Sequence, residues 1–299
     1  MNSDRQNSAE TRFAFGKNWA SFLASIDESR IARSANDLAS MLETDSLAGC
    51  RMLDIGSGSG LSSLAARRLG AVVHSFDYDI DSVRCTAELR NRYFPDDPHW
   101  TVEQGSILDK KYIESLGSFD VVYSWGVLHH TGQMWEAVAN ACAPVKKGGR
   151  LFIAIYNDQG FRSRAWRAIK KMYCKSPRII QTLFVLAAGL YFEGSSFAVS
   201  CITGRLGTWL RQRTHWREGR GMNRWHDLVD WVGGYPFEVA KPEEIFRFCR
   251  ERGFELKQLT TMGGGIGCNC YVFQRLTMGQ GGAIGHEPRI DLPMSRSAA

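Results

Sequence analysis

Hydrophobic and polar positions between residues 50 and 160 follow two alternating periods. Short apolar runs rich in β-branched residues predict strands, and apolar residues three or four positions apart predict helices between them. The predicted strands cover 51–55, 71–76, 100–104, 119–124 and 150–156. The predicted helices cover 61–69, 82–92 and 135–142, and a turn is expected at 146–149. Strands that alternate with helices form a parallel sheet with crossover helices, so the pattern predicts a doubly wound α/β fold.

The segments on either side extend the same fold. Upstream, apolar residues at helical spacing over 19–42 predict one or two helices that pack beside the sheet. Downstream, we expect a helix over 242–251 that is closed by Gly253, and then strands at 254–261 and 269–275 joined by a glycine turn. The complete prediction is a Rossmann-like, mostly parallel sheet of seven strands with a helical insertion.

The insertion separates the chain into segments of different character. We expect an N-terminal helical segment or lid at 1–48, an α/β core at 49–160, a helical cap at 161–240, a return to the core at 241–276 and a flexible tail at 277–299. Residues 161–220 contain twelve Lys or Arg and two Glu, a net +10, which leaves −4 for the rest of a chain of net charge +6. The basic character therefore belongs to the cap.

Composition narrows the class of protein only slightly. A chain of 299 residues with 44% hydrophobic residues can bury a full core, and a net charge of +6 is small for a protein that coats nucleic acid. The polar N-terminus lacks the basic-then-apolar order of a secretory signal, so we expect a cytoplasmic protein that starts near Met1. The eight cysteines have no framework spacing, and no second ligand pair accompanies Cys268 and Cys270, so reduced thiols and no metal site are expected.

A glycine-rich turn follows the first predicted strand, with the sequence Leu53-Asp54-Ile55-Gly56-Ser57-Gly58-Ser59-Gly60. Gly56, Gly58 and Gly60 allow a sharp reversal from strand into helix and let a ligand approach the backbone without interference from Cβ atoms. A dinucleotide site favours the spacing G-x-G-x-x-G with no acid at the turn, whereas this turn has G-x-G-x-G and is preceded by Asp54. The acid indicates a ligand that carries a positive amine.

A second acid, Asp77, follows the second predicted strand, seventeen residues after Gly60. That distance suits a carboxylate that accepts hydrogen bonds from a ribose diol. The alternative is that Asp77 caps the helix that follows it.

At these residues the chain resembles the class I S-adenosylmethionine-dependent methyltransferases. The resemblance implies that Asp54 lies near the methionyl ammonium group, that the glycines pass under the ligand and that Asp77 binds both ribose hydroxyls. A second match is the segment Phe119-Asp120-Val121-Val122-Tyr123-Ser124-Trp125-Gly126-Val127-Leu128-His129-His130, which is similar to the fourth-strand motif of the subgroup that includes quinone-biosynthesis methyltransferases. The likeness extends from about residue 50 to residue 157 and implies S-adenosyl-L-methionine as the cofactor.

The same resemblance suggests further residues at the cofactor. Many relatives have an acid after the third strand that binds the adenine amine, whereas this chain has Ser106, so we expect the Ser106 hydroxyl and the neighbouring backbone to hold adenine. Ser124 and Trp125 end the fourth strand, where the methyl group lies in this family. Phe15 and Trp19 are candidates for a lid over the ligand or for a hydrophobic anchor at the start of a helix.

The nature of the methyl acceptor decides which other residues are needed. Methyl transfer from a sulfonium depends on positioning and on exclusion of water, and a base is needed only if the acceptor loses a proton. His129 and His130, at the end of the fourth strand, are candidates for that base or for a packing role. In the cap, we expect His226, Asp230 or Tyr235 to face the acceptor, unless their aromatic-rich segment only excludes water.

Two cap segments are candidates for contact with a membrane. Residues 162–175 combine apolar positions at helical spacing with Lys and Arg, which is typical of a helix on an anionic membrane or of one that guides an anionic substrate. Residues 179–202 are mostly apolar, but their longest uninterrupted apolar run is about half of the roughly twenty residues that a span needs. We therefore expect a buried pair of cap helices there, with peripheral lipid contact through 161–203 as an option.

The sequence thus predicts a methyltransferase of small-molecule metabolism that modifies oxygen or carbon of a lipophilic hydroxylated compound. One alternative is S- or N-methylation of a small carboxylate-bearing metabolite such as an amino acid. An alternative of another class is RNA binding or RNA modification, which a cluster of arginines in the cap suggests. These are Arg205, Arg211, Arg213, Arg217 and Arg220.

Overall fold

The structure is a computed structural model that describes residues 26–214, 224–263 and 267–277, together with residues 13, 16, 23 and 265. Seven strands form one sheet in the order β3-β2-β1-β4-β5-β7-β6. Every pair is parallel except those that β7 makes with β5 and β6. The strands are β1 (Arg51–Ile55), β2 (Val72–Asp77), β3 (Trp100–Gln104), β4 (Phe119–Trp125), β5 (Val145–Tyr156), β6 (Phe254–Thr260) and β7 (Cys268–Arg275). This is the predicted doubly wound, mostly parallel fold.

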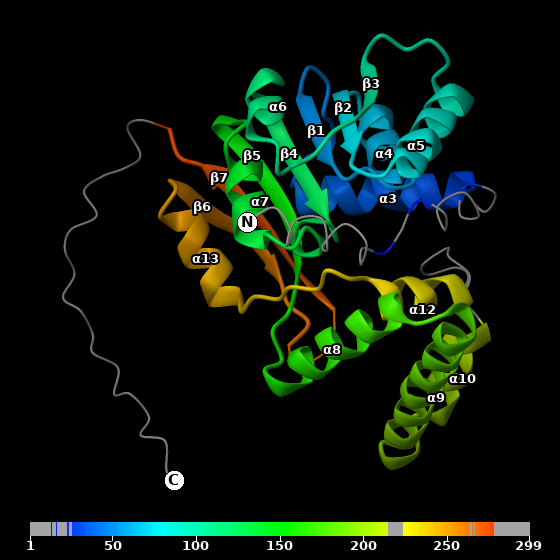
Figure 1. The fold of residues 1–299 in the computed structure, drawn as a ribbon. Helices are drawn as coiled ribbons and strands as arrows, with labels where there is room; N and C mark the ends of the chain where they lie inside the picture. Colours follow the sequence, from blue (N-terminus) through cyan, green and yellow to red (C-terminus); the bar gives the residue numbers. More distant parts are fainter. Residues whose placement is uncertain are drawn as a thin grey trace, which may run out of the picture.

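Helices cover both faces of the sheet (Figure 1). They are α3 (Glu28–Met41), α4 (Leu61–Arg68), α5 (Ile80–Tyr93), α6 (Lys110–Ser115), α7 (Met134–Cys142) and α13 (Pro242–Arg250). Successive residues of a strand face opposite sides of a sheet. Accordingly, Met52 packs in a core cluster with α3, α4 and α5, whereas Leu53 packs in a second cluster with α6, α7 and α13.

The cap is a separate group of helices that follows the end of β5 and adds a third small core. It contains α8 (Phe161–Lys175), α9 (Arg178–Ile202), α10 (Leu206–Thr214) and α12 (Arg224–Gly233). Tyr173, Val185, Ala188 and Val232 form its buried centre. Figure 1 shows these helices on the side of the sheet where β5 ends.

The expected pair of buried helices over 179–202 is wrong. The segment forms one helix of 25 residues, α9, of which only Val185 and Ala188 are buried. Gly189 and Gly194 do not interrupt it, because a glycine inside a helix costs only about 1 kcal/mol relative to alanine. Within the described residues, α9 is also the one helix with the length and composition that could cross a membrane.

The turn predicted at 146–149 is part of the long strand β5 in the structure. Phe119 of β4 pairs with Val145 and Val121 pairs with Arg150, so the intervening residues form an irregularity in the register. Gly148 has a φ of +76°, and Lys146 donates to both carboxylate oxygens of Asp120 at 2.9 Å. The turn-forming residues therefore distort β5 near its start without ending the strand.

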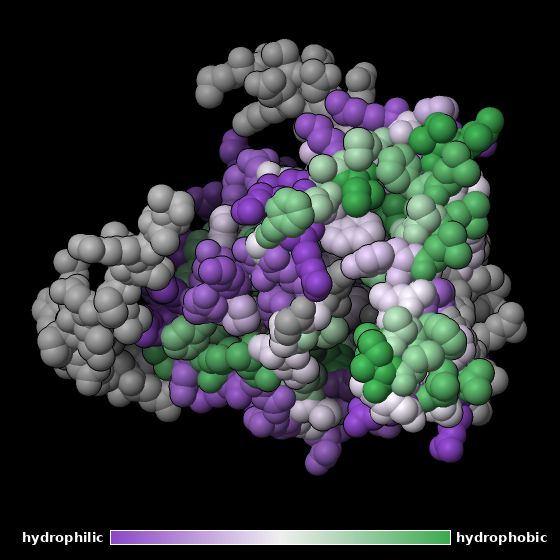
Figure 2. All heavy atoms as spheres, turned by 90° about the horizontal axis from the view of Figure 1, so that it is seen from below, coloured by the Kyte–Doolittle hydropathy of each residue, from purple (hydrophilic) through white to green (hydrophobic). Residues whose placement is uncertain are grey.

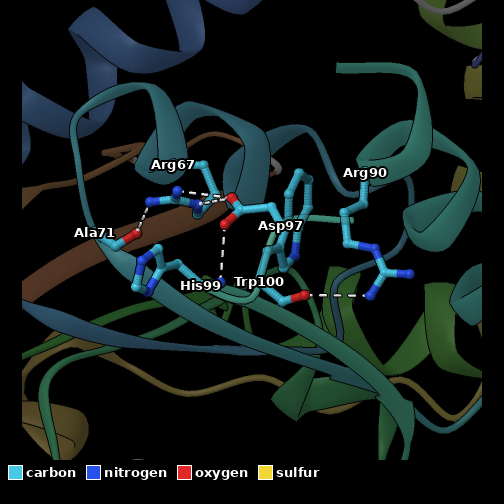
Figure 3. Close-up of polar contacts among 6 residues, drawn as sticks. All are labelled: Arg67, Ala71, Arg90, Asp97, His99 and Trp100. Carbon is cyan, nitrogen blue, oxygen red and sulfur yellow. Dashed lines mark hydrogen bonds and ion pairs between the residues drawn. The ribbon is translucent and has the colours of Figure 1, made fainter. Parts of the chain in front are cut away.

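A polar network holds the start of β3 against the end of α4 (Figure 3). Arg67 pairs with Asp97 at 2.7 Å and also donates to the Ala71 carbonyl, and Asp97 accepts a hydrogen bond from the His99 amide. Arg90 donates to the Trp100 carbonyl at 3.2 Å. The network fixes the start of β3 at Trp100, whose side chain is buried.

Candidate active site

The glycine-rich turn joins β1 to α4 and is bonded to the neighbouring strand. Gly56, Gly58 and Gly60 have φ values of +75°, +55° and +82°, in the left-handed region that favours glycine. The amide of Gly56 donates to the Phe76 carbonyl of β2 at 2.8 Å. A Cβ atom on Gly56 would lie 2.5 Å from both methyl groups of Val127, so only glycine fits there.

Asp54 lies at the end of β1 and is almost completely buried. Its carboxylate accepts a hydrogen bond from Ser63, the Ser63 hydroxyl lies 2.6 Å from the Ser75 hydroxyl, and the Trp100 indole donates to Ser75 at 2.9 Å. Burial is the main cause that raises the pKa of Asp54 to about 7; the Ser63 hydrogen bond opposes this rise, and the nearby Asp77 carboxylate adds a smaller upward contribution. The polar ladder from Trp100 thus orients an acid that has almost no contact with solvent.

Asp77 lies at the end of β2 and is oriented by two backbone amides. Its Oδ2 accepts from Gly58 at 3.0 Å and its Oδ1 accepts from Asp79 at 2.9 Å. Burial raises the pKa of Asp77 to about 6, although these two amides favour the ionised form. Because one amide belongs to the glycine turn, Asp77 also holds that turn in place.

Both acids line one large cavity between the sheet and the cap, with a volume of about 1950 Å³. The core side contributes, among the predicted residues, Asp54, Gly56, Gly58, Asp77, Ser106, Trp125 and His130. Of the predicted cap residues, Asp230 lines the cavity. The structure therefore brings most of the predicted site together in one place.

Ser124 and Tyr235 do not line the cavity, contrary to expectation. Ser124 is fully buried and donates to the Ile55 carbonyl at 3.1 Å, because its neighbours Tyr123 and Trp125 take the other side of the strand. The carbonyl of Tyr235 accepts from the Phe13 amide at 3.0 Å, and it is Phe13 that lines the cavity.

Three other predicted positions have different placements. Gly60 is buried at the start of α4, outside the cavity wall, and a Cβ there would lie 3.0 Å from the Thr86 backbone. The backbone of His226 belongs to α12, but its side chain lies outside the described residues. Phe15 and Trp19 also lie outside them, so their role as a lid stays a prediction.

The two histidines after β4 have distinct surroundings. His129 is fully buried against the Tyr156 ring, 4.2 Å between centroids, and burial holds its pKa well below 6.5. His130 lines the cavity, and its Nδ1 donates to the Pro236 carbonyl at 2.6 Å. In a neutral imidazole this bond makes Nε2 the basic nitrogen. His129 is therefore a packing residue, and His130 is the candidate base.

Ser106 and Trp125, which are predicted to contact adenine and the methyl group, both line the cavity. Ser106 lies in the loop after β3, and its hydroxyl accepts a hydrogen bond from the Leu108 amide at 3.2 Å while it lines the cavity. Trp125 is 51% exposed, although it lies in the same cavity wall. An exposed aromatic side chain in the same cavity wall as the buried Asp54 and the half-buried Asp77 is available to contact a ligand.

Sequence reasoning missed Asp79 and its hydrogen bond with the backbone of Gly16. The Asp79 side chain lines the cavity, caps α5 through the Asp81 amide and accepts from the Gly16 amide at 2.9 Å. The Phe13 amide donates to the Tyr235 carbonyl, so these two N-terminal residues bond to one residue after β2 and to one after α12. Asp79 could have been recognised from its position two residues after Asp77, as the N-cap of the next helix.

The cap supplies further residues to the cavity, some of them from the aromatic-rich segment that was predicted to face the acceptor. Its aromatic and apolar members are Tyr191, Phe192, Val199, Trp209, Trp225, Leu228 and Trp231. Arg162 and Glu193 are charged residues of the same wall. Because these residues come from four helices far apart in sequence, only the folded cap brings them together.

The residues present fit S-adenosylmethionine. Two neighbouring carboxyl groups whose pKa values are raised by burial are best neutralised by a cationic ligand. Asp54 would hold the ammonium group, Asp77 the ribose hydroxyls, and the loop with Ser106 the adenine. The cavity exceeds the roughly 300–1,000 Å³ of an ordinary ligand site, so an acceptor has room beside the cofactor.

The fold and this site are those of a class I methyltransferase, and comparison with known proteins agrees. A family model described as a methyltransferase domain matches residues 23–258. The match covers more than half of the chain, so the chain belongs to the methyltransferase-domain family. The expected class and its cofactor, S-adenosylmethionine, are thereby confirmed, and the RNA alternative has no support.

Curated relatives match the core of the chain. The ubiquinone biosynthesis O-methyltransferase of Xanthomonas oryzae pv. oryzae (strain PXO99A) is 35% identical over 112 residues, which is 37% of this chain and 45% of the relative. The protein of the same name from Xanthomonas axonopodis pv. citri (strain 306) is 34% identical over 111 residues, 37% of this chain and 44% of the relative. The match thus spans less than half the length of these relatives.

Solved structures with a similar arrangement include the magnesium protoporphyrin IX methyltransferase (ChlM) from Synechocystis PCC 6803 with bound SAH. It has 13% identity and a TM-score of 0.48, and the alignment covers 84% of this chain and 86% of that one. An O-methyltransferase family protein from Burkholderia thailandensis has 16% identity and a TM-score of 0.48, with 83% and 57% covered.

Proposed function

We propose that this protein transfers the methyl group of S-adenosylmethionine to a hydroxyl oxygen of a lipophilic small molecule. The observation that carries the proposal is the shared cavity, in which Asp54 and Asp77 occur together with His130 and an apolar, aromatic cap wall. The volume of about 1950 Å³ accommodates both a nucleoside cofactor and an acceptor with an apolar tail. The curated relatives named as ubiquinone biosynthesis O-methyltransferases support oxygen as the accepting atom.

The bound cofactor supplies an electrophilic methyl group on a sulfonium. The task of the protein is to bind, to orient and to manage one proton. Asp54 and Asp77 fix the two ends of the cofactor, and the cap wall excludes water from the reacting groups. His130 accepts the hydroxyl proton of the acceptor at Nε2 while its Nδ1–H stays bonded to the Pro236 carbonyl, so the acceptor oxygen gains nucleophilic character.

The alternative acceptor, a carboxylate-bearing metabolite, is favoured by one observation. Arg162, at the start of α8, is the basic residue of the described cavity wall and has the charge to bind a carboxylate. A thioether acceptor would make no use of His130 as a base because it loses no proton, whereas an amine acceptor must first lose its ammonium proton. The hydroxyl acceptor is therefore expected to depend on His130, and the carboxylate-bearing acceptor on Arg162.

The test is a methyl-transfer assay with isotope-labelled cofactor and three acceptors: a catechol with a polyprenyl tail, the same catechol without the tail, and a mixture of amino acids. We expect product from both catechols and a higher kcat/KM for the tailed one. His130→Gln should lower kcat about 100-fold or more with an unchanged cofactor Kd, as general-base catalysis predicts. His99→Gln, at an exposed histidine outside the cavity, is the matched control.

Two results would contradict the proposal. Methylation of amino acids alone, with a loss on Arg162→Gln and none on His130→Gln, would support the alternative. Cofactor binding without transfer to any hydroxyl acceptor would leave the oxygen-directed function without support.

A further inference from the structure

Helix α9 has an exposed apolar stripe along the side that faces away from the cap core. It consists of Ile179, Leu183, Leu186, Leu190 and Phe197, which are spaced four, three, four and seven residues apart and so share one helix face. Ile179 and Leu190 are 78% and 76% exposed. Soluble monomers rarely expose a continuous apolar surface of this kind without a partner.

Further exposed apolar residues lie beyond the stripe, at the end of α9 and on α10. Ile202, the last residue of α9, is 86% exposed, and Leu206 and Leu210 of the adjoining α10 are also exposed. Figure 2 shows hydrophobic side chains gathered on the side of the molecule where α9 and α10 lie in Figure 1. The surface therefore extends over the outer side of the cap.

The charge around the stripe is positive. Lys171, Lys175 and Arg178 are exposed at the end of α8 and the start of α9, and Arg205 and Arg211 are exposed beyond the other end of α9. Residues 161–214 contain one acidic residue, Glu193, which lines the cavity and lies beside the stripe, three residues after Leu190, so basic residues clearly outnumber acidic ones there. An apolar helix face with basic residues at both ends is complementary to a bilayer with anionic headgroups.

We propose that the stripe of α9 docks this protein on an anionic lipid bilayer, with the helix lying in the interface. Other sides of the same helix contribute Phe192, Ser195, Ser196 and Val199 to the cavity wall, so α9 cannot be surrounded by lipid without exposing that polar lining. The docked helix thus lies between the cavity and the bilayer. A lipophilic acceptor passes from the bilayer along the side of this helix into the cavity. The last step rests on the proposed function, whereas docking itself does not.

The experiment is sedimentation of the full-length protein with vesicles of phosphatidylcholine alone and with a fraction of phosphatidylglycerol. We expect stronger binding to the anionic vesicles, weakened by salt and reversed by alkaline carbonate. Replacing Leu183 and Leu190 together, Leu183→Asp/Leu190→Asp, should lower binding at least tenfold. Leu259→Asp, at an exposed leucine of β6, applies the same change outside the cap and should leave binding unchanged.

The charge contribution is tested separately with Lys171→Gln/Lys175→Gln. This variant should lose affinity for anionic vesicles at least tenfold and keep the weak affinity for phosphatidylcholine, because a basic residue near the surface acts on anionic headgroups. Equal binding of this variant and the unmodified protein would overturn the electrostatic part of the proposal.

Three other outcomes would also overturn it. Absence of binding to both vesicles excludes docking. Concentration-dependent dimerisation in analytical ultracentrifugation, lost in Leu183→Asp/Leu190→Asp, assigns the stripe to a second copy of the chain. Resistance to carbonate identifies a spanning helix in place of an interfacial one.

Failure of docking can be told apart from failure of the proposed function. Leu183 and Leu190 lie outside the cavity wall, so the stripe variant should keep the cofactor Kd and the turnover of the untailed catechol. A stripe variant that loses only turnover of the vesicle-bound, tailed acceptor supports docking as the route of supply. Vesicle binding with no turnover of any acceptor leaves docking in place and contradicts the function.

Discussion

Replacing Asp54 with asparagine should stabilise the cofactor-free protein and weaken its affinity for the cofactor. Asp54 is almost completely buried, and among the described residues its hydrogen-bond donor is Ser63. An asparagine of the same size can still accept that bond through its carbonyl oxygen. The substitution therefore removes the buried charge and leaves the packing nearly intact.

The size of the effect follows from the pKa of Asp54. Folding raises this pKa from 3.8 to about 7. A carboxyl with a raised pKa contributes stability that is fully present below its unfolded-state pKa and is lost as the pH rises through the folded-state pKa. At about 1.4 kcal/mol per pH unit, a gap of about three units amounts to about 4 kcal/mol of lost stability above pH 7. Allowing for a weaker bond from Ser63 to the neutral amide, we expect a gain of about 2–4 kcal/mol at pH 8.

The assay is urea unfolding of the cofactor-free protein at pH 8 and at pH 4.5, analysed by linear extrapolation. Asp54→Asn should unfold at a higher urea concentration at pH 8, and most of the difference should disappear at pH 4.5. Calorimetric titration of the same variant with S-adenosylmethionine should show at least a tenfold weaker Kd, because a charge-assisted contact to the ammonium is lost. Asp45→Asn, at an exposed aspartate, is the control and should change neither quantity.

If Asp54→Asn is no more stable than the unmodified protein at pH 8, the buried charge of Asp54 does not destabilise the fold, and the prediction is wrong. A gain that is equally large at pH 4.5 would also refute it, because the carboxyl is then largely neutral and carries no penalty. Unchanged cofactor affinity would show that the ammonium is bound elsewhere.

Three further predictions concern the same cavity. Asp77→Asn should weaken cofactor binding by at least about 1.5 kcal/mol, since a charged acceptor for the ribose hydroxyls is lost; an unchanged Kd in calorimetry would contradict that role. Cofactor affinity of the unmodified protein should fall as the pH is lowered from 8 to 5.5, because binding requires the ionised forms of Asp54 and Asp77, with pKa values of about 7 and about 6; calorimetry in two buffers should detect release of protons, and a flat profile would count against it. Gly56→Ala should destabilise the fold by about 2–4 kcal/mol, since it combines a φ of +75° with a Cβ 2.5 Å from the Val127 methyls. Gly49→Ala has a φ of +78° and no atom within 4 Å, so it should cost clearly less in thermal unfolding, and equal losses would show that the contact with Val127 is unimportant.

The sheet could be predicted from the sequence because each strand carries its own signal. β1 and β3 begin and end at the predicted residues; β1 is a short, mostly apolar run, and β3 alternates apolar and polar residues from Trp100 to Val102. Helix α6 was missed because six residues give too little periodicity, and its start is set by one cap, in which the Asp109 side chain accepts from the Tyr112 amide at 3.1 Å. The continuous helix α9 was missed because glycines were given too much weight as breaks.

The candidate site was likewise predictable only in part. The acids and glycines at the ends of β1 and β2 were predictable, because parallel strands bring their carboxyl ends to one edge. Ser124 was misplaced by one position of strand alternation, which a family resemblance does not resolve. The choice between His129 and His130, and the replacement of Tyr235 by Phe13, depend on how the cap packs against the core, and no local pattern contains that information.

The backbone amides of Phe13 and Gly16 have a consequence for the rate of turnover. They donate to the Tyr235 carbonyl, after the cap helix α12, and to the Asp79 side chain, after β2, and Phe13 and Asp79 both line the cavity. We expect release of the demethylated cofactor past Phe13 and Gly16 to require that at least one of these bonds opens. The first round of methylation in a rapid-mix experiment should therefore outpace the later rounds, with departure of the demethylated cofactor setting the steady rate.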